Sequence, residues 1–101
     1  MGIRGRDRYE LAAALELKML TERLDNLRAL AERTSGEHRF ALERALDQVR
    51  GIRNRTEAKI EDVRRASDDA WQLVKVHADS ALAQFRGGLD QIESQFRRVA
   101  A

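Results

Sequence analysis

Apolar residues recur every three to five positions along almost the whole chain, with charged residues between them. Steps of this size place apolar side chains on one face of an α-helix. We therefore expect a helix over residues 7–33, after a frayed tail at residues 1–6. Its apolar face is assigned to six leucines, Leu11, Leu15, Leu20, Leu24, Leu27 and Leu30.

The stretch RTSGEHR at residues 33–39 interrupts this pattern. Gly36 suits the C-terminal end of a helix. Thr34 and Glu37 match the capping box that opens a helix, a Ser or Thr followed three residues later by Glu. The sequence therefore predicts a turn or a kink at residues 34–36.

A longer period covers most of the chain. Counting in elevens from Met19 meets only apolar residues, Leu30, Ala41, Ile52, Val63, Val74, Phe85 and Phe96, and a second row runs through Val49, Ile60, Trp71 and Leu82. Eleven residues make three helical turns, a period typical of nearly straight or slightly right-handed coiled coils. This favours one long helix over residues 37–99.

Two places could break that long helix. Ser67 could cap a new helix, with Asp68 and Asp69 in a first turn that favours anions. No Gly or Pro stops the chain there, so a continuous helix is favoured. At residues 87–88 two adjacent glycines each weaken a helix by about 1 kcal/mol relative to alanine. They could bend it or let another backbone approach closely.

Helix lengths raise the question of a partner. A helix over residues 7–33 is about 40 Å long and one over 37–99 about 95 Å. An antiparallel hairpin would leave the apolar residues beyond about position 63 uncovered, with Trp71 as their largest member. We therefore predict an all-α fold, a hairpin or a three-helix coiled coil, that self-associates or binds another helical protein. The predicted interface is Leu24, Leu27, Ile60, Val63, Trp71, Val74, Ala78, Leu82, Phe85, Leu89 and Phe96.

Composition agrees with a single helical domain over residues 1–101. The chain has no Pro and no Cys, and aromatic residues make up 5%. The absence of cysteine excludes disulfides and thiolate metal sites. The longest apolar run, Leu11–Leu15, is too short to span a bilayer, and the charged start MGIRGRDR lacks the apolar core of a signal peptide. We expect a soluble, cytoplasmic protein.

No motif predicts catalysis, a metal or a cofactor. His38 and His77 are isolated and lack the spacing of helical metal sites. The carboxylates of Asp68 and Asp69, being neighbours, point about 100° apart on a helix and do not share a site. Gly87 and Gly88 lack the Lys and Ser or Thr of a phosphate-binding loop. The protein is not expected to be an enzyme.

Charge suggests two further partners. The chain has 19 basic and 17 acidic residues, a net charge of +2. Arg50, Arg53 and Arg55 lie close in sequence and are candidates for contact with an anion. Because many arginines have an acid within helical reach, nucleic-acid binding is not favoured. Eleven-residue amphipathic repeats also occur on exchangeable lipid-surface helices, so a lipid or granule surface is the alternative partner.

The stretches SDDAWQLVK (67–75) and ALAQFRGGLDQIESQF (81–96) resemble the C-terminal signature of small bacterial coiled-coil proteins, some of which carry a stress-response label. The matching residues are Asp69, Ala70, Trp71, Lys75, Phe85, Leu89 and Phe96. The chain departs from the usual pattern at Val74 and Leu82. The resemblance implies a helical, self-associating cytoplasmic protein without a catalytic site.

Overall fold

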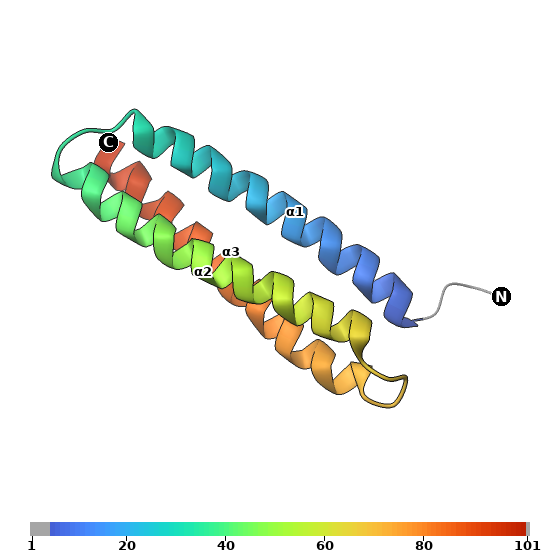
Figure 1. Ribbon diagram of the computed structural model, residues 1–101. Helices are drawn as coiled ribbons and strands as arrows, with labels where there is room; N and C mark the ends of the chain where they lie inside the picture. The colour runs from blue at the N-terminus through green and yellow to red at the C-terminus, as the bar shows by residue number, and fades with distance from the viewer. Residues whose placement is uncertain (1–4, 101) are drawn as a thin grey trace.

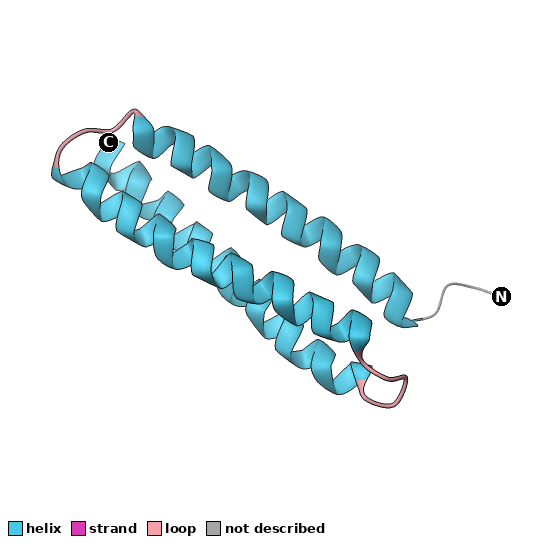
Figure 2. Ribbon diagram, viewed as in Figure 1, coloured by secondary structure: helices cyan, strands magenta, loops and turns pink. Residues whose placement is uncertain are grey.

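The computed structural model describes the backbone of residues 5–100 and the side chains of residues 5–97. Three helices fill almost all of this range: α1 (Gly5–Glu32), α2 (Glu37–Arg65) and α3 (Trp71–Ala100) (Figure 1). No strand occurs among the described residues (Figure 2). The prediction of an all-α fold is confirmed, in its three-helix form.

The helices lie side by side in a bundle that measures 55 × 21 × 17 Å. The chain reverses at each turn, so α2 is antiparallel to both neighbours and α3 runs in the same direction as α1 (Figure 1). The helices contain 28, 29 and 30 residues and are therefore each about 42–45 Å long. Because their lengths match, no helix extends far beyond the others.

The first turn falls at the predicted place, residues 33–36. Gly36 has φ 75° and precedes the first residue of α2. Glycine adopts this left-handed region without the steric penalty of a side chain. The predicted capping box is wrong, because no side chain caps α2. The Thr34 hydroxyl donates instead to the Leu30 carbonyl at 3.1 Å and closes the end of α1.

The second turn corrects the prediction of one helix over residues 37–99. α2 ends where Ala66 takes extended backbone angles, φ −70° and ψ 152°. The Ser67 carbonyl accepts from Ala70 N at 3.1 Å and from Trp71 N at 3.0 Å, so it caps the start of α3 through the backbone. Asp68 precedes α3 instead of lying in its first turn.

Arg6 on α1 holds this second turn. Its guanidinium donates to the Ala66 carbonyl, which has lost its helical partner, and forms an ion pair with Asp68 at 3.2 Å. A helix end needs such acceptors for its last carbonyls. The turn is therefore stabilised by a residue sixty positions earlier in the chain.

The two glycines at 87–88 do not break α3. A Cβ added at Gly88 would lie 3.1 Å from Cγ2 of Val49, whereas one added at Gly87 would meet nothing within 4 Å. Gly88 therefore lets α2 approach α3 closely. The group that approaches is the side chain of Val49 and not the backbone that was expected, and the helix is not broken.

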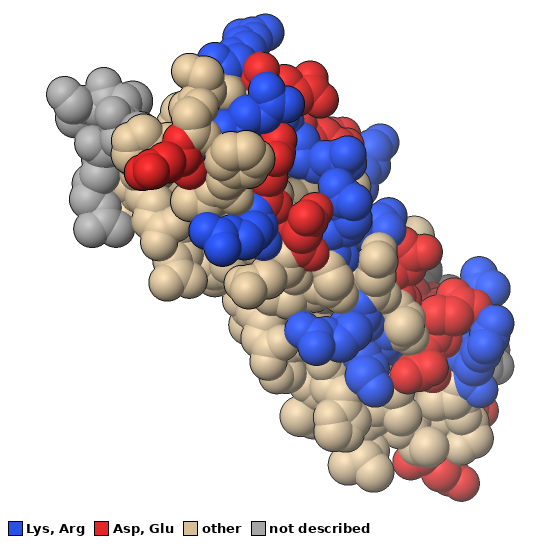
Figure 3. Space-filling model, turned by 60° about the vertical axis from the view of Figure 1, so that its left-hand side comes forward, with Lys and Arg blue, Asp and Glu red and all other residues tan. Residues whose placement is uncertain are grey.

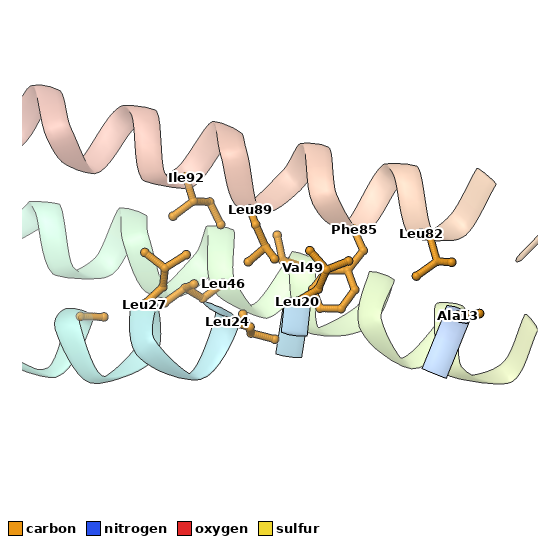
Figure 4. Packing of buried hydrophobic residues seen from close by; sticks show 11 residues of the cluster. Ala13, Leu20, Leu24, Leu27, Leu46, Val49, Leu82, Phe85, Leu89 and Ile92 are labelled. Carbon is orange, nitrogen blue, oxygen red and sulfur yellow. The ribbon is translucent and has the colours of Figure 1, made fainter. Parts of the chain in front are cut away.

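The core runs along the bundle axis (Figure 4). Phe85 and Leu89 of α3 are completely buried. Thr56 is the buried polar residue of the core, and its hydroxyl lies 2.8 Å from the Ile52 carbonyl and 3.2 Å from the Ala81 carbonyl on α3. The other large members are Leu20, Leu24 and Leu27 from α1, Leu46 and Val49 from α2, and Leu82 and Ile92 from α3.

Candidate interaction surface

The residues predicted to form an intermolecular interface lie between the helices of a single chain. Because the chain turns at residues 66–70, α1 and α2 cover the apolar stripe that a hairpin would leave bare. The length argument for self-association therefore does not apply. Seven of the predicted residues are buried, Leu24, Leu27, Val63, Ala78, Leu82, Phe85 and Leu89, and four are half-buried, Ile60, Trp71, Val74 and Phe96.

Trp71 has partners within the chain, contrary to the expectation that it anchors a second chain. Its ring lies against Tyr9 of α1, with the ring centroids 6.5 Å apart and the planes at 43°. A Cβ built at Gly5 would lie 3.6 Å from Cζ2 of Trp71, so the start of α1 also covers the ring. Trp71 therefore joins the first and third helices at one end of the bundle.

The hydroxyl of Tyr9 takes part in the same cluster. It donates to Asp79 Oδ1 at 2.6 Å, while Lys75 Nζ lies 3.4 Å from Asp79 Oδ2 and 5.2 Å from the centroid of the Tyr9 ring. Burial of the phenol, together with its hydrogen bond to Asp79, raises the pKa of Tyr9 above its ordinary value. The protonated phenol thus serves as a hydrogen-bond donor that links α1 to α3.

Further polar contacts join α1 to α3. Arg23 contacts Asp90 at 2.7 Å and Glu93 at 2.8 Å, and Glu16 pairs with Arg86. The described charged residues of α3 share the side that faces α1, because helical spacing places them within an arc of about 60°. They lie at positions 75, 79, 86, 90, 93 and 97. Among the residues of α3 whose side chains are described, the opposite side carries no Lys, Arg, Asp or Glu. In Figure 3 uncharged side chains occupy most of the lower left edge of the molecule, and charged ones gather toward its upper right side.

The three arginines predicted to contact an anion do not form one site. Arg50 and Arg53 line a groove between α1 and α2 together with Arg28, whereas Arg55 is not among the residues that line it. Two residues make about 200° of helix rotation, which places Arg55 on the far side of α2 from Arg53. Arg50 lies 3.7 Å from Asp47 and Arg53 lies 2.9 Å from Glu57, so both charges have acidic neighbours.

The outer side of α1 carries an apolar stripe that the bundle does not cover. Leu11, Leu15 and Met19 are 65%, 59% and 58% exposed. The prediction that Leu11 and Leu15 lie on the core face is wrong. The five-residue step from Leu15 to Leu20 turns about 140° around a helix, and this was the signal that the two leucines belong to another face.

Exposed charged residues without an ion pair lie at the two ends of this stripe. Arg8 precedes it and Glu22 follows it, and both side chains are exposed. Neither forms an ion pair with another side chain in the described range. Helical spacing places both charges on the same side of α1 as Leu15. We call the five residues Arg8, Leu11, Leu15, Met19 and Glu22 the α1 outer face.

Smaller apolar exposures occur on the other helices. Leu73 and Val76 near the start of α3 are 72% and 61% exposed, and Phe40 near the start of α2 is 67% exposed. Single exposed apolar residues are normal on soluble proteins, whereas three on successive turns of one helix form a continuous stripe. The α1 outer face is therefore the strongest candidate for an interaction surface.

The described residues contain no candidate metal site. No group of three or more His, Cys, Asp or Glu side chains among them is arranged to hold a metal ion. His38 and His77 are both exposed and lie on different helices. Within the described range, no helix is both long and apolar enough to span a bilayer.

Comparisons with known proteins add no relative. No family model matches the chain, and the searches of curated proteins and of solved structures find no similar protein. The resemblance to small bacterial coiled-coil proteins therefore stays a prediction.

Proposed function

We propose that the protein is a non-enzymatic helical module that binds a partner protein through the α1 outer face. The observation that carries this proposal is the exposure of Leu11, Leu15 and Met19 on successive turns of one helix. Covering a large apolar side chain is worth about 1.5–3 kcal/mol when it is fully buried. A partner that covers all three would gain much of this free energy.

The rest of the bundle supports a scaffold role. The core joins all three helices, and the contacts of Arg6, Arg23 and Tyr9 hold α1 against the other two. Such a bundle presents its outer helix faces on a rigid support, which lowers the entropic cost of binding. The polar contacts of Arg6, Arg23 and Tyr9 act as links between helices.

A lipid or granule surface is the competing partner. Helices that bind anionic lipid surfaces combine a broad apolar face with basic flanks. The α1 outer face is narrow and is bordered by opposite charges, with Glu22 at one end. A carboxylate at the border disfavours an anionic surface and suits a protein partner that offers a cation.

Photo-crosslinking in cells tests the proposal. A photoreactive residue replaces Leu15, and a matched variant carries it at Ala58, an exposed position on α2. We expect a protein adduct of discrete mass from position 15, absent from position 58 and lost when Leu11 and Met19 are both replaced by Glu. Adducts to lipid alone, or equal labelling at both positions, would overturn the proposal.

A further inference from the structure

We propose that the partner of the α1 outer face is a second copy of this chain, paired antiparallel about a twofold axis at Leu15. This inference rests on the proposed interaction function and names its partner. The proposed contact uses the outer side of α1 instead of the predicted interface, most of whose residues are buried within the bundle.

The spacing of the α1 outer face has the symmetry that such a pairing needs. Its five positions are separated by steps of three, four, four and three residues, which read the same in both directions from Leu15. In an antiparallel pair centred there, Leu15 faces the partner's Leu15 and Leu11 faces the partner's Met19. A twofold interface must be self-complementary in this way, because each residue pair occurs twice.

Charge selects the antiparallel orientation. Arg8 lies seven residues before Leu15 and Glu22 lies seven residues after it. In the antiparallel pair each Arg8 therefore faces the partner's Glu22, and two opposite-charge pairs close the two ends of the contact. In a parallel pair each of these charges would face its own copy, which is unfavourable.

Both charges are available for this contact. Arg8 and Glu22 are exposed and have no ion-pair partner within the described residues, whereas Arg23, Arg39 and Arg53 each pair with an acid. The apolar positions between them are also open, since more than half of the surface of each is exposed. No helix has to move for the pairing to form.

The size of the surface sets the expected strength. The contact consists of three apolar side chains from each copy and the flanking parts of two helices. Its total buried area is therefore near the lower limit of about 1,000 Å² for specific interfaces. Contacts of this size are typically weak and reversible. We therefore expect a dimer with a Kd on the order of micromolar that dissociates on dilution.

Sedimentation equilibrium of the purified full chain tests the pairing. We expect Leu15→Glu to raise the dimer Kd by at least about thirty-fold, because two carboxylates would meet at the axis without water. The matched control is Leu73→Glu on α3, which is similarly exposed and should leave the Kd unchanged. Circular dichroism checks that both variants stay helical. Loss of the dimer in the Leu73 variant alone would overturn the proposal.

Charge exchange tests the orientation independently of the apolar contact. Arg8→Glu and Glu22→Arg should each raise the Kd by about ten-fold, because each places two like-charge pairs at the ends of the dimer. The double variant, with both charges exchanged, should restore the native Kd. Additive weakening in the double variant would exclude the antiparallel register.

The two proposals fail in different ways. A native chain that remains monomeric at millimolar concentration, while position 15 still crosslinks to a different protein in cells, would overturn self-pairing and leave the interaction function standing. A chain that dimerises through α3 and shows no adduct at position 15 would overturn both. Both proposals are supported if Leu15→Glu abolishes the dimer and if the double charge exchange restores the affinity that each single exchange lowers.

Discussion

α1 and α3 have nearly the same length, yet they distribute their apolar residues differently. In α3 the largest core residues, Phe85 and Leu89, are fully buried, and the large exposed apolar side chains among its described residues are Leu73 and Val76 near its start. In α1 apolar side chains occupy both the core side and the outer side of the first half. A helix that is apolar on two sides contains more apolar surface than a three-helix bundle can cover, and its outer side is therefore where a partner is expected.

The two helices are also held by different contacts. α3 packs closely on α2, where Gly88 admits Val49 and the buried Thr56 lies within hydrogen-bond distance of α3. The edge between α1 and α3 is joined by ion pairs and by the Tyr9 cluster. Close apolar contact joins α2 to α3, and α1 docks on both through its own buried leucines. The partly exposed ion pairs between α1 and α3 add little free energy to this docking.

The largest expected effect separates buried from exposed apolar residues. Phe85→Ala should lower the free energy of unfolding by about 3–5 kcal/mol, because it removes a fully buried ring and leaves a cavity. Leu15→Ala should change it by less than about 0.5 kcal/mol, because the side chain is mostly exposed in the monomer. Urea unfolding at a concentration well below the dimer Kd measures both. Equal losses would mean that the outer side of α1 contributes to the core.

A smaller effect tests the close approach of α2 and α3. Gly87→Ala should stabilise the protein by about 1 kcal/mol, since it removes a helical glycine at a site with open space. Gly88→Ala gains the same helix propensity but forces its Cβ to within 3.1 Å of Val49. We expect no net gain from it. Thermal unfolding of the pair compares them directly, and an equal gain in Tm would show that the two helices do not approach closely.

The smallest effect concerns the Tyr9 link between α1 and α3. Tyr9→Phe should cost about 0.5–1 kcal/mol, the net value of one hydrogen bond. Because folding raises the pKa of Tyr9, its contribution is fully present below the unfolded pKa of about 10 and is lost as pH rises through the higher folded value. The unfolding free energy of the native chain should therefore fall more steeply above pH 10 than that of the variant.

This pH dependence can be followed without interference from another phenol. Tyr9 is the only tyrosine of the chain, so phenolate absorbance reports on it alone. The folded protein should titrate at higher pH than the urea-unfolded chain. Coincident titration curves would contradict the contact with Asp79.

Several features of the fold were accessible from the sequence because their causes are local. Leucine-rich periodicity and the absence of proline indicate helices, and Gly36 marks a turn through its backbone freedom. The apolar rows also contain several residues of the core, among them Val49, Leu82 and Phe85, but Met19 and Ala41 of the first row are exposed. The side of α1 on which Leu11 and Leu15 lie could also be predicted, because the five-residue step before Leu20 moves them to another face. The average spacing of the six leucines does not show this step.

The second turn shows why the rest could not be predicted. Ser67 and the two aspartates after it are a local signal for a break, but no Gly or Pro stops the helix at Ala66. The eleven-residue row also passes through the break without losing phase. Ending the helix there is unfavourable locally, because it breaks hydrogen bonds and leaves the Ala66 carbonyl without its helical partner. The cost is offset by residues far away in the sequence, through Arg6 at the turn and through the burial of Phe85 and Leu89 against α1 and α2.

The sequence by itself determined that the chain is helical, where the first turn lies and which residues have the period of a core. The tertiary structure decided whether that core is closed within one chain or between chains, and which apolar residues remain outside. The physical reason is the range of the interactions involved. Helix propensity and periodicity act over a few residues, whereas the choice between one long helix and two packed helices depends on apolar burial between segments up to seventy residues apart.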